Sequence, residues 1–355
     1  MAFPTHAYVS LEDPQERDFA TRDPRAFLAR YSNGAILDEI QRAPDLASYI
    51  QGIVDTKQKH GQFILTGSEN FALSTTVSQS LAGRTAVFTL LPLSMSELSS
   101  TLQTQSVEDI LYRGFYPRIF DQSVSPTTFY GSYVQTYVER DLRNLSNIHD
   151  LGVFQTFLKL CAGRTGQLLN LENLGNEAGV SHTTAKKWIS LLETSYIVQQ
   201  LRPYYKNFNK RITKTPKLYF ADVGLACYLL GIQTPIHLQA HPLKGPLFET
   251  MVVMELLKSR FNQGLSSNLY FFRDSNDNEV DVIMETSSGL AAIEIKSGQT
   301  ITPNFWKGLD YFSAVSGKKM PVQNFLVYGG IEKQLRNAGT VVGFRECAGI
   351  NETTL

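Results

Sequence analysis

The sequence predicts an α/β protein of more than one domain, and three observations lead to this prediction. A short apolar run, residues 35–37, leads directly into two adjacent carboxylates, Asp38 and Glu39. A buried parallel strand is typically such a run, and ligands bind outside the carboxyl ends of parallel strands. The length of 355 residues exceeds one ordinary core and favours two or three domains. The pattern along the chain changes from α/β alternation to helices and then to strands.

Residues 1–100 alternate short apolar runs with helical segments, which is typical of an α/β unit. The apolar run at 63–66 ends in a polar tip that includes Ser68, so it resembles a strand lying beside the one that ends in Asp38 and Glu39. In P-loop domains such an Asp holds Mg²⁺ and an acidic neighbour prepares the attacking water. The alternative is a strand end followed by a charged helix start. The expected strands are 8–11, 35–38, 63–66 and 85–90, and the expected helices are 23–31, 45–59 and 71–81.

The phosphate-binding partner of these acids is missing from the sequence. A P-loop requires the string Gly-x-x-x-x-Gly-Lys-Ser/Thr, in which backbone N–H groups cradle the phosphates and the Lys reaches the terminal ones. No such string occurs in the 355 residues. We therefore expect this polypeptide to bind ATP poorly. We also expect the 63–66 strand to be an edge, or to pair with the strand predicted at 85–90.

Composition limits the classes of function. The net charge is zero, with 33 basic and 33 acidic residues, so affinity for nucleic acid has to come from local patches. The three cysteines fit neither a disulfide framework nor a metal-site spacing, which indicates a reducing compartment. No signal peptide and no uninterrupted apolar run of about 18 residues is found. These features predict a cytoplasmic protein without a membrane span.

Residues 101–235 read as helices followed by a helix-turn-helix pattern. Aromatic residues recur at helical spacing at Tyr130, Tyr133 and Tyr137, and such a stripe is usually core. Apolar residues then predict one helix over 171–178 and a second over 184–192. The strands 197–201 and 217–220 would follow as a wing.

The predicted wing and second helix carry basic residues that could contact phosphates. No acidic residue occurs between residues 202 and 217, where six cations lie. The alternative is a packing module with a solvated basic wing. The candidate DNA contacts are Lys206, Lys210, Arg211 and Lys214, together with Lys186 and Lys187 on the second helix; Arg202 and Lys217 belong to the same basic stretch.

In residues 236–355 the pattern changes to one typical of strands. Strands are predicted at 269–273, 279–285, 289–296 and 324–328, and helices at 246–261 and 304–315. Asp281 lies on one strand, while Glu294 and Lys296 share a face of the next because strand side chains alternate. If these strands pair, both carboxylates could hold Mg²⁺, and Glu249 on the preceding helix could join them. The alternative is the ordinary solvent face of a strand.

The last domain resembles the PD-(D/E)-x-K nuclease core, with Val280 where the motif has Pro. The whole chain resembles a prokaryotic family of AAA-type ATPases that carry a C-terminal domain of unknown function, itself a winged helix followed by a nuclease-like fold. The residues that carry this resemblance are 8–14, 37–42, 65–68, 80–84, 137–141, 217–226, 279–281 and 294–297.

The resemblance implies a fold and a set of roles. The fold would be a truncated P-loop NTPase sheet over residues 1–100, a helical and winged-helix region over 101–235, and a restriction-endonuclease-like α/β domain over 236–355. Asp38 and Glu39 would be the Walker B acids, Ser68 a sensor-like polar group and Arg84 a phosphate-sensing Arg. Members begin with a strand and Walker A loop that this sequence lacks. Either the reading frame starts too late, in which case an in-frame P-loop upstream would restore the ATPase, or this is a decayed member whose C-terminal half is still in use.

Three functions compete at this stage. The first is an ATPase-family protein, with ATP and Mg²⁺ as ligands, that drives a DNA-directed module and forms oligomers as AAA-type ATPases do. The second is a DNA-binding protein that does not hydrolyse ATP. The third is an Mg²⁺-dependent nuclease that uses Asp281, Glu294 and Lys296 and is independent of ATP.

Overall fold

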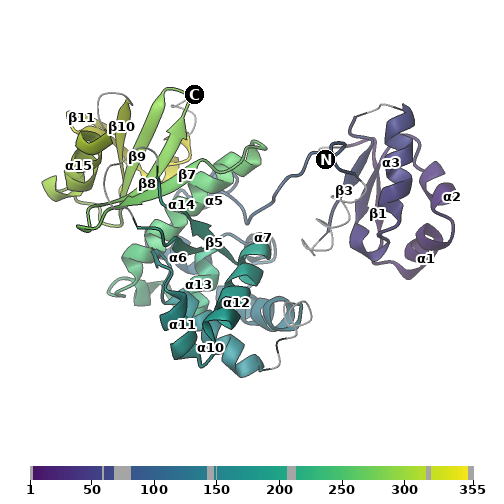
Figure 1. The fold of residues 1–355 in the computed structure, drawn as a ribbon, viewed down its shortest axis with the longest axis horizontal. Helices are drawn as coiled ribbons and strands as arrows, with labels where there is room; N and C mark the ends of the chain where they lie inside the picture. The colour runs from purple at the N-terminus through teal and green to yellow at the C-terminus, as the bar shows by residue number, and fades with distance from the viewer. Residues whose placement is uncertain are drawn as a thin grey trace. The chain divides into compact units, whose positions relative to one another are not determined.

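The computed structural model describes residues 3–57, 60–67, 81–141, 148, 150–205, 213–316 and 321–350 (Figure 1). The chain folds as two compact units, residues 1–87 and 88–355. Each unit has its own sheets and its own buried apolar residues. The two units are therefore described one after the other.

The first unit is built on a parallel sheet of three strands with β2 in the centre, as its apolar run predicts. Among the described residues β3 pairs with β2 and lies at the edge of this sheet, which was one of the two arrangements expected for it. Asp13 and Asp23 cap the first two helices by accepting backbone N–H groups. The strands are β1 (Ala7–Ser10), β2 (Ala35–Asp38) and β3 (Phe63–Leu65); the helices are α1 (Pro14–Arg22), α2 (Pro24–Ala29) and α3 (Leu46–Lys57).

The strand predicted at 85–90 is wrong. These residues form no strand, and Val87, Phe88 and Leu90 are 75%, 66% and 87% exposed. An alternating apolar pattern becomes a strand only where a neighbouring strand can pair with it, and none does here. The segment instead joins the two units. The helix predicted at 71–81 falls almost entirely outside the described residues, as does Ser68.

The second unit begins with short helices packed around an aromatic core. Tyr130 is 1% exposed, and Tyr133 stacks on Tyr137 with ring centroids 5.3 Å apart, so the predicted stripe belongs to the packed interior. The elements are α5 (Ser99–Leu102), α6 (Val107–Arg113), α7 (Pro117–Asp121), α8 (Pro126–Tyr133), a π-helix (Val134–Asp141) and α13 (Val223–Leu229).

Three further helices and a small sheet form around Trp188, whose ring meets those of Phe154 and Phe157 edge-on at 5.1 Å. Gly179 ends one helix in the left-handed region, with φ of 75°, and Ser181 caps the next. The sheet is antiparallel with β6 between β4 and β5. The elements are α10 (Leu151–Ala162), β4 (Gln167–Leu168), α11 (Leu171–Ala178), α12 (His182–Thr194), β5 (Val198–Leu201) and β6 (Lys217–Phe220).

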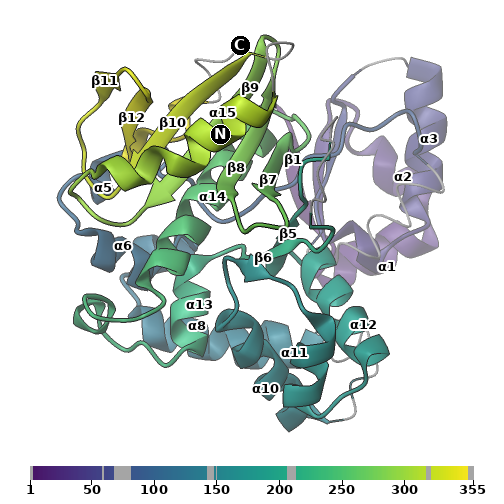
Figure 2. The same ribbon diagram turned by 60° about the vertical axis from the view of Figure 1, so that its left-hand side comes forward.

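The C-terminal part is a mixed sheet of six strands in the order β11-β12-β10-β9-β8-β7. The helices α14 and α15 lie on opposite faces of this sheet (Figure 2), and apolar residues of each pack against it. No described helix is long and apolar enough to cross a membrane. The elements are α14 (Lys244–Asn262), β7 (Leu269–Arg273), β8 (Glu279–Thr286), β9 (Gly289–Lys296), α15 (Lys307–Ser316), β10 (Val322–Tyr328), β11 (Gln334–Arg336) and β12 (Gly339–Gly343).

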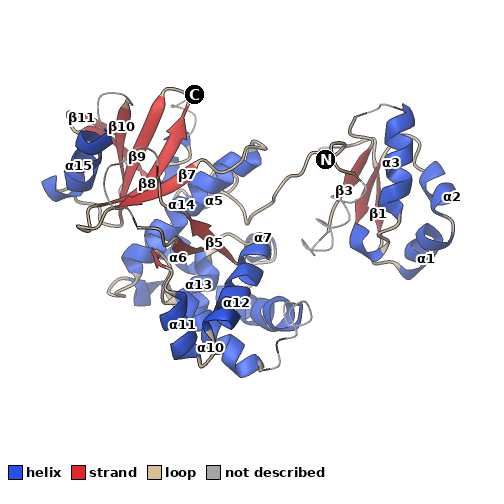
Figure 3. Ribbon diagram, viewed as in Figure 1, coloured by secondary structure: helices blue, strands red, loops and turns tan. Residues whose placement is uncertain are grey.

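The protein is thus of mixed α/β class, with a parallel three-stranded sheet near the N-terminus and a mixed sheet near the C-terminus (Figure 3). This is the class that the sequence predicts. The site candidates lie at the carboxyl end of β2 in the first unit, and on α12, α14, β8 and β9 in the second.

Candidate functional sites

Asp281 lies where strands β8 and β9 stop pairing regularly. The antiparallel ladder runs from the pair Thr286–Gly289 to the pair Val282–Ile293. Beyond it, the Asp281 carboxylate accepts the backbone N–H of Ile295 at 2.8 Å. A side chain therefore takes the place of a ladder partner, which holds the carboxylate between the two strands.

Lys296 joins the two carboxylates that the sequence analysis singled out. Its Nζ lies 2.6 Å from Glu294 Oε1 and 3.8 Å from Asp281 Oδ2. Strand alternation puts Glu294 and Lys296 on one face, and the antiparallel pairing with β8 brings Asp281 to them. The three side chains therefore form one group on adjacent strands.

Glu249, on α14, reaches this group through a lysine that was expected elsewhere. Lys217 Nζ lies 2.9 Å from Glu249 Oε1, 2.6 Å from Glu279 Oε1 and 3.8 Å from Asp281 Oδ1. The side chain of Lys217 is only 2% exposed. Its expected place in an accessible basic wing that could contact phosphates is therefore wrong, because β6 is the central strand of its sheet and is buried throughout.

Glu279 and two residues that contact this group, Tyr219 and Arg273, were not singled out from the sequence. The Tyr219 hydroxyl donates to Glu249 Oε1 at 2.6 Å, and Arg273 donates to Glu279 Oε2 at 3.0 Å. A usable signal was present, since Lys217 and Tyr219 stand two apart in the run Lys-Leu-Tyr-Phe. Their side chains therefore share one face of a strand that is apolar enough to be buried. We call Lys217, Glu249, Glu279, Asp281, Glu294 and Lys296 the carboxylate cluster.

Burial and like charge shape the proton affinities in the carboxylate cluster. Burial, assisted by the charge of Asp281, raises the pKa of Glu249 to about 7 and the pKa of Glu294 to about 8. Burial by itself would lower the pKa of Lys217, but Tyr219 and the surrounding carboxylates outweigh it and hold the pKa above its ordinary value. Lys217 therefore stays charged throughout the physiological range.

The oxygen donors of the cluster have the chemistry that Mg²⁺ prefers. Glu294 Oε2 is buried and has no hydrogen-bond partner among the described atoms, so it retains a lone pair that a cation could use. Over the same described ranges, no three His, Cys, Asp or Glu side chains are gathered in the manner of a metal site.

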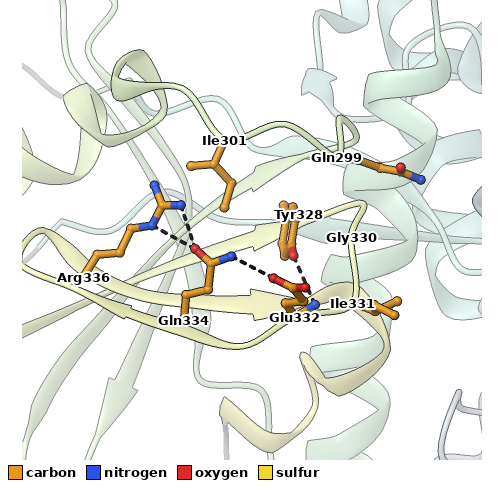
Figure 4. A pocket seen from close by; sticks show the side chains of 8 residues that line it. All are labelled: Gln299, Ile301, Tyr328, Gly330, Ile331, Glu332, Gln334 and Arg336. Atoms are coloured by element: carbon orange, nitrogen blue, oxygen red, sulfur yellow. Dashed lines mark hydrogen bonds between the residues drawn. The ribbon is translucent and has the colours of Figure 1, made fainter.

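A shallow pocket of about 370 Å³ opens near the end of β10 (Figure 4). Tyr328 lines it, and this residue is the register partner of Lys296 on β9. Arg336 donates twice to Gln334, which in turn donates to Glu332. The pocket thus lies beside the same strand ends as Lys296.

The acids of the first unit lie at the carboxyl end of the central strand β2. Asp38 accepts the Tyr8 hydroxyl at 2.6 Å through Oδ2 and the Thr66 hydroxyl through Oδ1. Glu39 adopts the left-handed region, with φ of 59°, and accepts Gln41 Nε2 at 2.5 Å. Both acids are half-buried, and both engage protein donors.

Arg84 makes an ion pair with Asp55, with the guanidinium Nε 2.6 Å from the carboxylate. Both side chains are more than a third exposed. The role expected for Ser68 concerns a residue outside the described ranges.

The exposed face of α12 carries Lys186 and Lys187 together with His182 and Thr183. The opposite face is buried through Ala185, Trp188 and other apolar residues. Of the remaining candidate DNA contacts, Lys214 is exposed, whereas Lys206, Lys210 and Arg211 lie outside the described residues.

Comparison with known proteins matches the three parts of the chain to three family models. Residues 3–99 match the AAA domain, residues 104–235 a domain of unknown function (DUF8612), and residues 244–347 a domain of unknown function (DUF4143). These matches support an AAA-type ATPase-like protein that carries a C-terminal domain of unknown function, in agreement with that part of the sequence prediction.

Relatives among curated proteins have no assigned activity. The chain is 30% identical over 295 residues to uncharacterized proteins of Mycobacterium tuberculosis and Mycobacterium bovis, which covers 82% of this chain. The match spans 64% of the length of these mycobacterial relatives. An uncharacterized protein of Haemophilus influenzae is 24% identical over 183 residues, covering 47% of this chain and 46% of its own.

The solved structure of protein VC1899 from Vibrio cholerae aligns over 98% of this chain and 97% of its own. The TM-score is 0.24 and the sequence identity 13%. Values this low carry no argument about fold or function.

Proposed function

We propose that this chain is an AAA-family ATPase-like protein that works on DNA, and that residues 150–220 form a winged helix whose second helix, α12, contacts the phosphate backbone. The observation that carries this proposal is the exposed face of α12. Lys186 and Lys187 stand there side by side, and the first two turns of the helix contain no acidic residue.

The chemistry of such a contact follows from the charge distribution. The net charge is zero, so no general field attracts DNA and the attraction has to be local. Lysine ammonium groups bind phosphates as point charges and carry no sequence information by themselves. The expected binding is therefore sensitive to salt and similar for unrelated duplexes.

The test compares the unaltered chain with the double variant Lys186→Ala/Lys187→Ala on two duplexes of unrelated sequence. Each phosphate contact that is lost should flatten the log–log salt dependence by about 0.9, so the double variant should lose up to about 1.8. Lys307→Ala, which removes an exposed lysine on α15, is the matched control and should leave the slope unchanged. An identical slope in the double variant and the unaltered chain would reject α12 as the contact.

The ATPase part of the proposal rests on Asp38 and Glu39. Their position at the carboxyl end of a central parallel strand is where ligands bind in such sheets. Asp38 would hold Mg²⁺ and Glu39 would orient a water, as Walker B acids do. The phosphates themselves require a P-loop, and its string is absent from these 355 residues.

A second candidate function is an Mg²⁺-dependent nuclease-like site at the carboxylate cluster. The observation in its favour is that Lys296 lies within ion-pair distance of both Asp281 and Glu294. These two carboxylates would hold the ion, which lowers the pKa of a bound water when present. Lys296 would orient that water or stabilise developing charge. Cleavage of DNA that requires Mg²⁺ and is lost in Asp281→Ala would support it; cleavage that persists in this variant would reject it.

A further inference from the structure

The carboxylate cluster already contains a cation that belongs to the protein. Lys217 comes from β6, in the sheet that follows α12, yet its ammonium group lies among carboxylates of α14 and β8. We propose that Lys217 is a tethered cation that competes with a divalent ion for Glu249, Glu279 and Asp281, so that the cluster takes up a divalent cation only when Lys217 is withdrawn. This proposal rests on the second candidate function insofar as the cluster is a cation site. With Lys217 lying among them, the described carboxylates are not gathered in the manner of a metal site, so uptake of the ion requires them to close in after Lys217 leaves.

The contacts indicate that the Lys217 ammonium group occupies the carboxylate cluster and does not form a loose ion pair at the surface. The three carboxylate oxygens lie at 2.6, 2.9 and 3.8 Å from the Lys217 Nζ, and the lysine is 2% exposed. Bound Mg²⁺ or Mn²⁺ needs carboxylate oxygens at close to 2 Å. A divalent ion and the ammonium group would therefore have to share the same oxygens at short range, and their like charges repel.

The charge of the cluster is also suited to an exchange of cations. Glu249, Glu279, Asp281 and Glu294 face Lys217 and Lys296, so two negative charges are in excess when every group is ionised. Arg273 adds a positive charge at Glu279 but shares it with Asp277. With every group ionised, removal of Lys217 would leave three excess negative charges in a largely buried site, which attracts a divalent ion.

The strand that carries Lys217 is tied to the helix-turn-helix module. Lys217 pairs with Leu201 of β5 and with Leu168 of β4, and β5 follows α12 in the chain after a short turn. Tyr219 on the same strand donates to Glu249, so β6 contacts the cluster twice. A shift of β6 would therefore move both groups together. The proposed DNA-contacting helix and the cluster are joined by this strand.

The segment after β5 continues the connection to the C-terminal sheet. Phe271 of β7 donates its N–H to Arg202 O at 3.0 Å and accepts the N–H of Tyr204 at 2.8 Å. β5, one of the two strands that flank Lys217 in the small sheet, therefore leads directly into the edge of the large sheet. This arrangement allows an event at the module to change the occupancy of the cluster.

The test measures Mn²⁺ binding to the full chain by isothermal titration at low salt. Lys217→Met keeps the length and apolar character of the side chain but removes its charge. We expect it to bind one Mn²⁺ about tenfold more tightly or better than the unaltered chain. Lys159→Met, at an exposed lysine of α10, is the matched control and should behave like the unaltered chain. Adding Asp281→Asn to Lys217→Met should abolish the gain.

Equal or weaker Mn²⁺ binding by a folded Lys217→Met protein would overturn the proposal. If this variant does not fold, Mn²⁺ binding is compared between Glu249→Gln and the double variant Glu249→Gln/Lys217→Met. The double variant removes both members of a buried charge pair. In the unaltered chain, saturating Mn²⁺ should speed amide hydrogen exchange in residues 217–220. If Mn²⁺ binds and the amide hydrogen exchange of residues 217–220 does not change, the proposal is also overturned. None of these measurements uses DNA. A Lys217→Met protein that binds Mn²⁺ but does not cleave DNA would therefore reject the nuclease candidate and leave this proposal standing.

Discussion

The Tyr130 hydroxyl donates to Asp222 Oδ1 at 2.6 Å in the interior of the second unit, and this bond joins α8 to the first turn of α13. The same carboxylate accepts the N–H groups of Leu225 at 2.9 Å and Phe115 at 2.7 Å. Tyr130 is 1% exposed and Asp222 likewise 1%. Burial raises the pKa of Asp222 above its ordinary value, while these donors oppose the rise.

This network predicts a large loss of stability in Asp222→Ala. The substitution leaves the buried N–H groups of Leu225 and Phe115 without an acceptor, while the Tyr130 hydroxyl keeps only the carbonyl oxygen of Arg113. We therefore expect a cost of about 3 kcal/mol or more in the free energy of unfolding. Tyr130→Phe removes one donor and leaves the other bonds, so about 1–2 kcal/mol is expected. Urea denaturation followed by tryptophan fluorescence measures both. Equal losses in the two variants would contradict the network.

Two buried charged side chains of α14, Lys258 and Glu255, anchor the segment that leads into the second unit. Lys258 Nζ donates to Leu93 O at 2.8 Å and lies 4.0 Å from the centre of the Phe115 ring, while Glu255 accepts the N–H of Met95 at 2.8 Å. Lys258→Met would leave the buried Glu255 without its neighbouring cation, so we expect a loss of about 3 kcal/mol in the free energy of unfolding.

The control for this prediction removes both charges. Lys258→Met/Glu255→Gln keeps an acceptor for the N–H of Met95 and leaves no uncompensated charge, so it should recover part of the loss. Urea denaturation of the single and double variants gives the comparison. A double variant that is less stable than Lys258→Met alone would show that the two side chains do not act as a pair.

The carboxylate cluster predicts a fall in stability as pH rises from about 5 to about 8. The folded pKa of Glu249 is about 7 and that of Glu294 about 8, above the unfolded value of roughly 4.3. The folded state therefore binds more protons in this window, and the free energy of unfolding declines with pH by at most about 1.4 kcal/mol per pH unit for each group.

Glu249→Gln/Glu294→Gln should flatten this dependence, because neither amide titrates. Chemical denaturation at several pH values between 5 and 8.5 measures the slope. Glu172→Gln, which changes an exposed carboxylate in the first turn of α11, is the control and should retain the slope of the unaltered chain. A double variant with an unchanged slope would place the titrating groups elsewhere.

The polypeptide of residues 1–355 should bind Mg-ATP weakly. The triphosphate is held mainly by P-loop amides and the P-loop lysine, whereas Asp38 and Glu39 present negative charge to it. Both oxygens of Asp38 also accept hydroxyl donors from the protein, Tyr8 and Thr66. Isothermal titration tests this, and a micromolar dissociation constant would mean that these 355 residues hold phosphates by another route.

Local chemistry was enough to predict much of the architecture. The apolar run that ends in Asp38 forms the central strand of the first sheet because three consecutive apolar residues suit burial on both faces. Strand alternation was sufficient to group Glu294 with Lys296, since it depends only on their spacing.

Contacts between residues far apart in the chain had to come from the tertiary structure. By itself the sequence determined the apolar runs and the shared face of Glu294 and Lys296, both of which follow from neighbours a few residues away. It could not reveal that residues 85–90 find no strand to pair with, nor that Lys217 is buried beside Glu249 and Glu279. A lysine's environment depends on which helices and strands close over it, and here α14 and β8 supply the carboxylates that make burial of its charge tolerable.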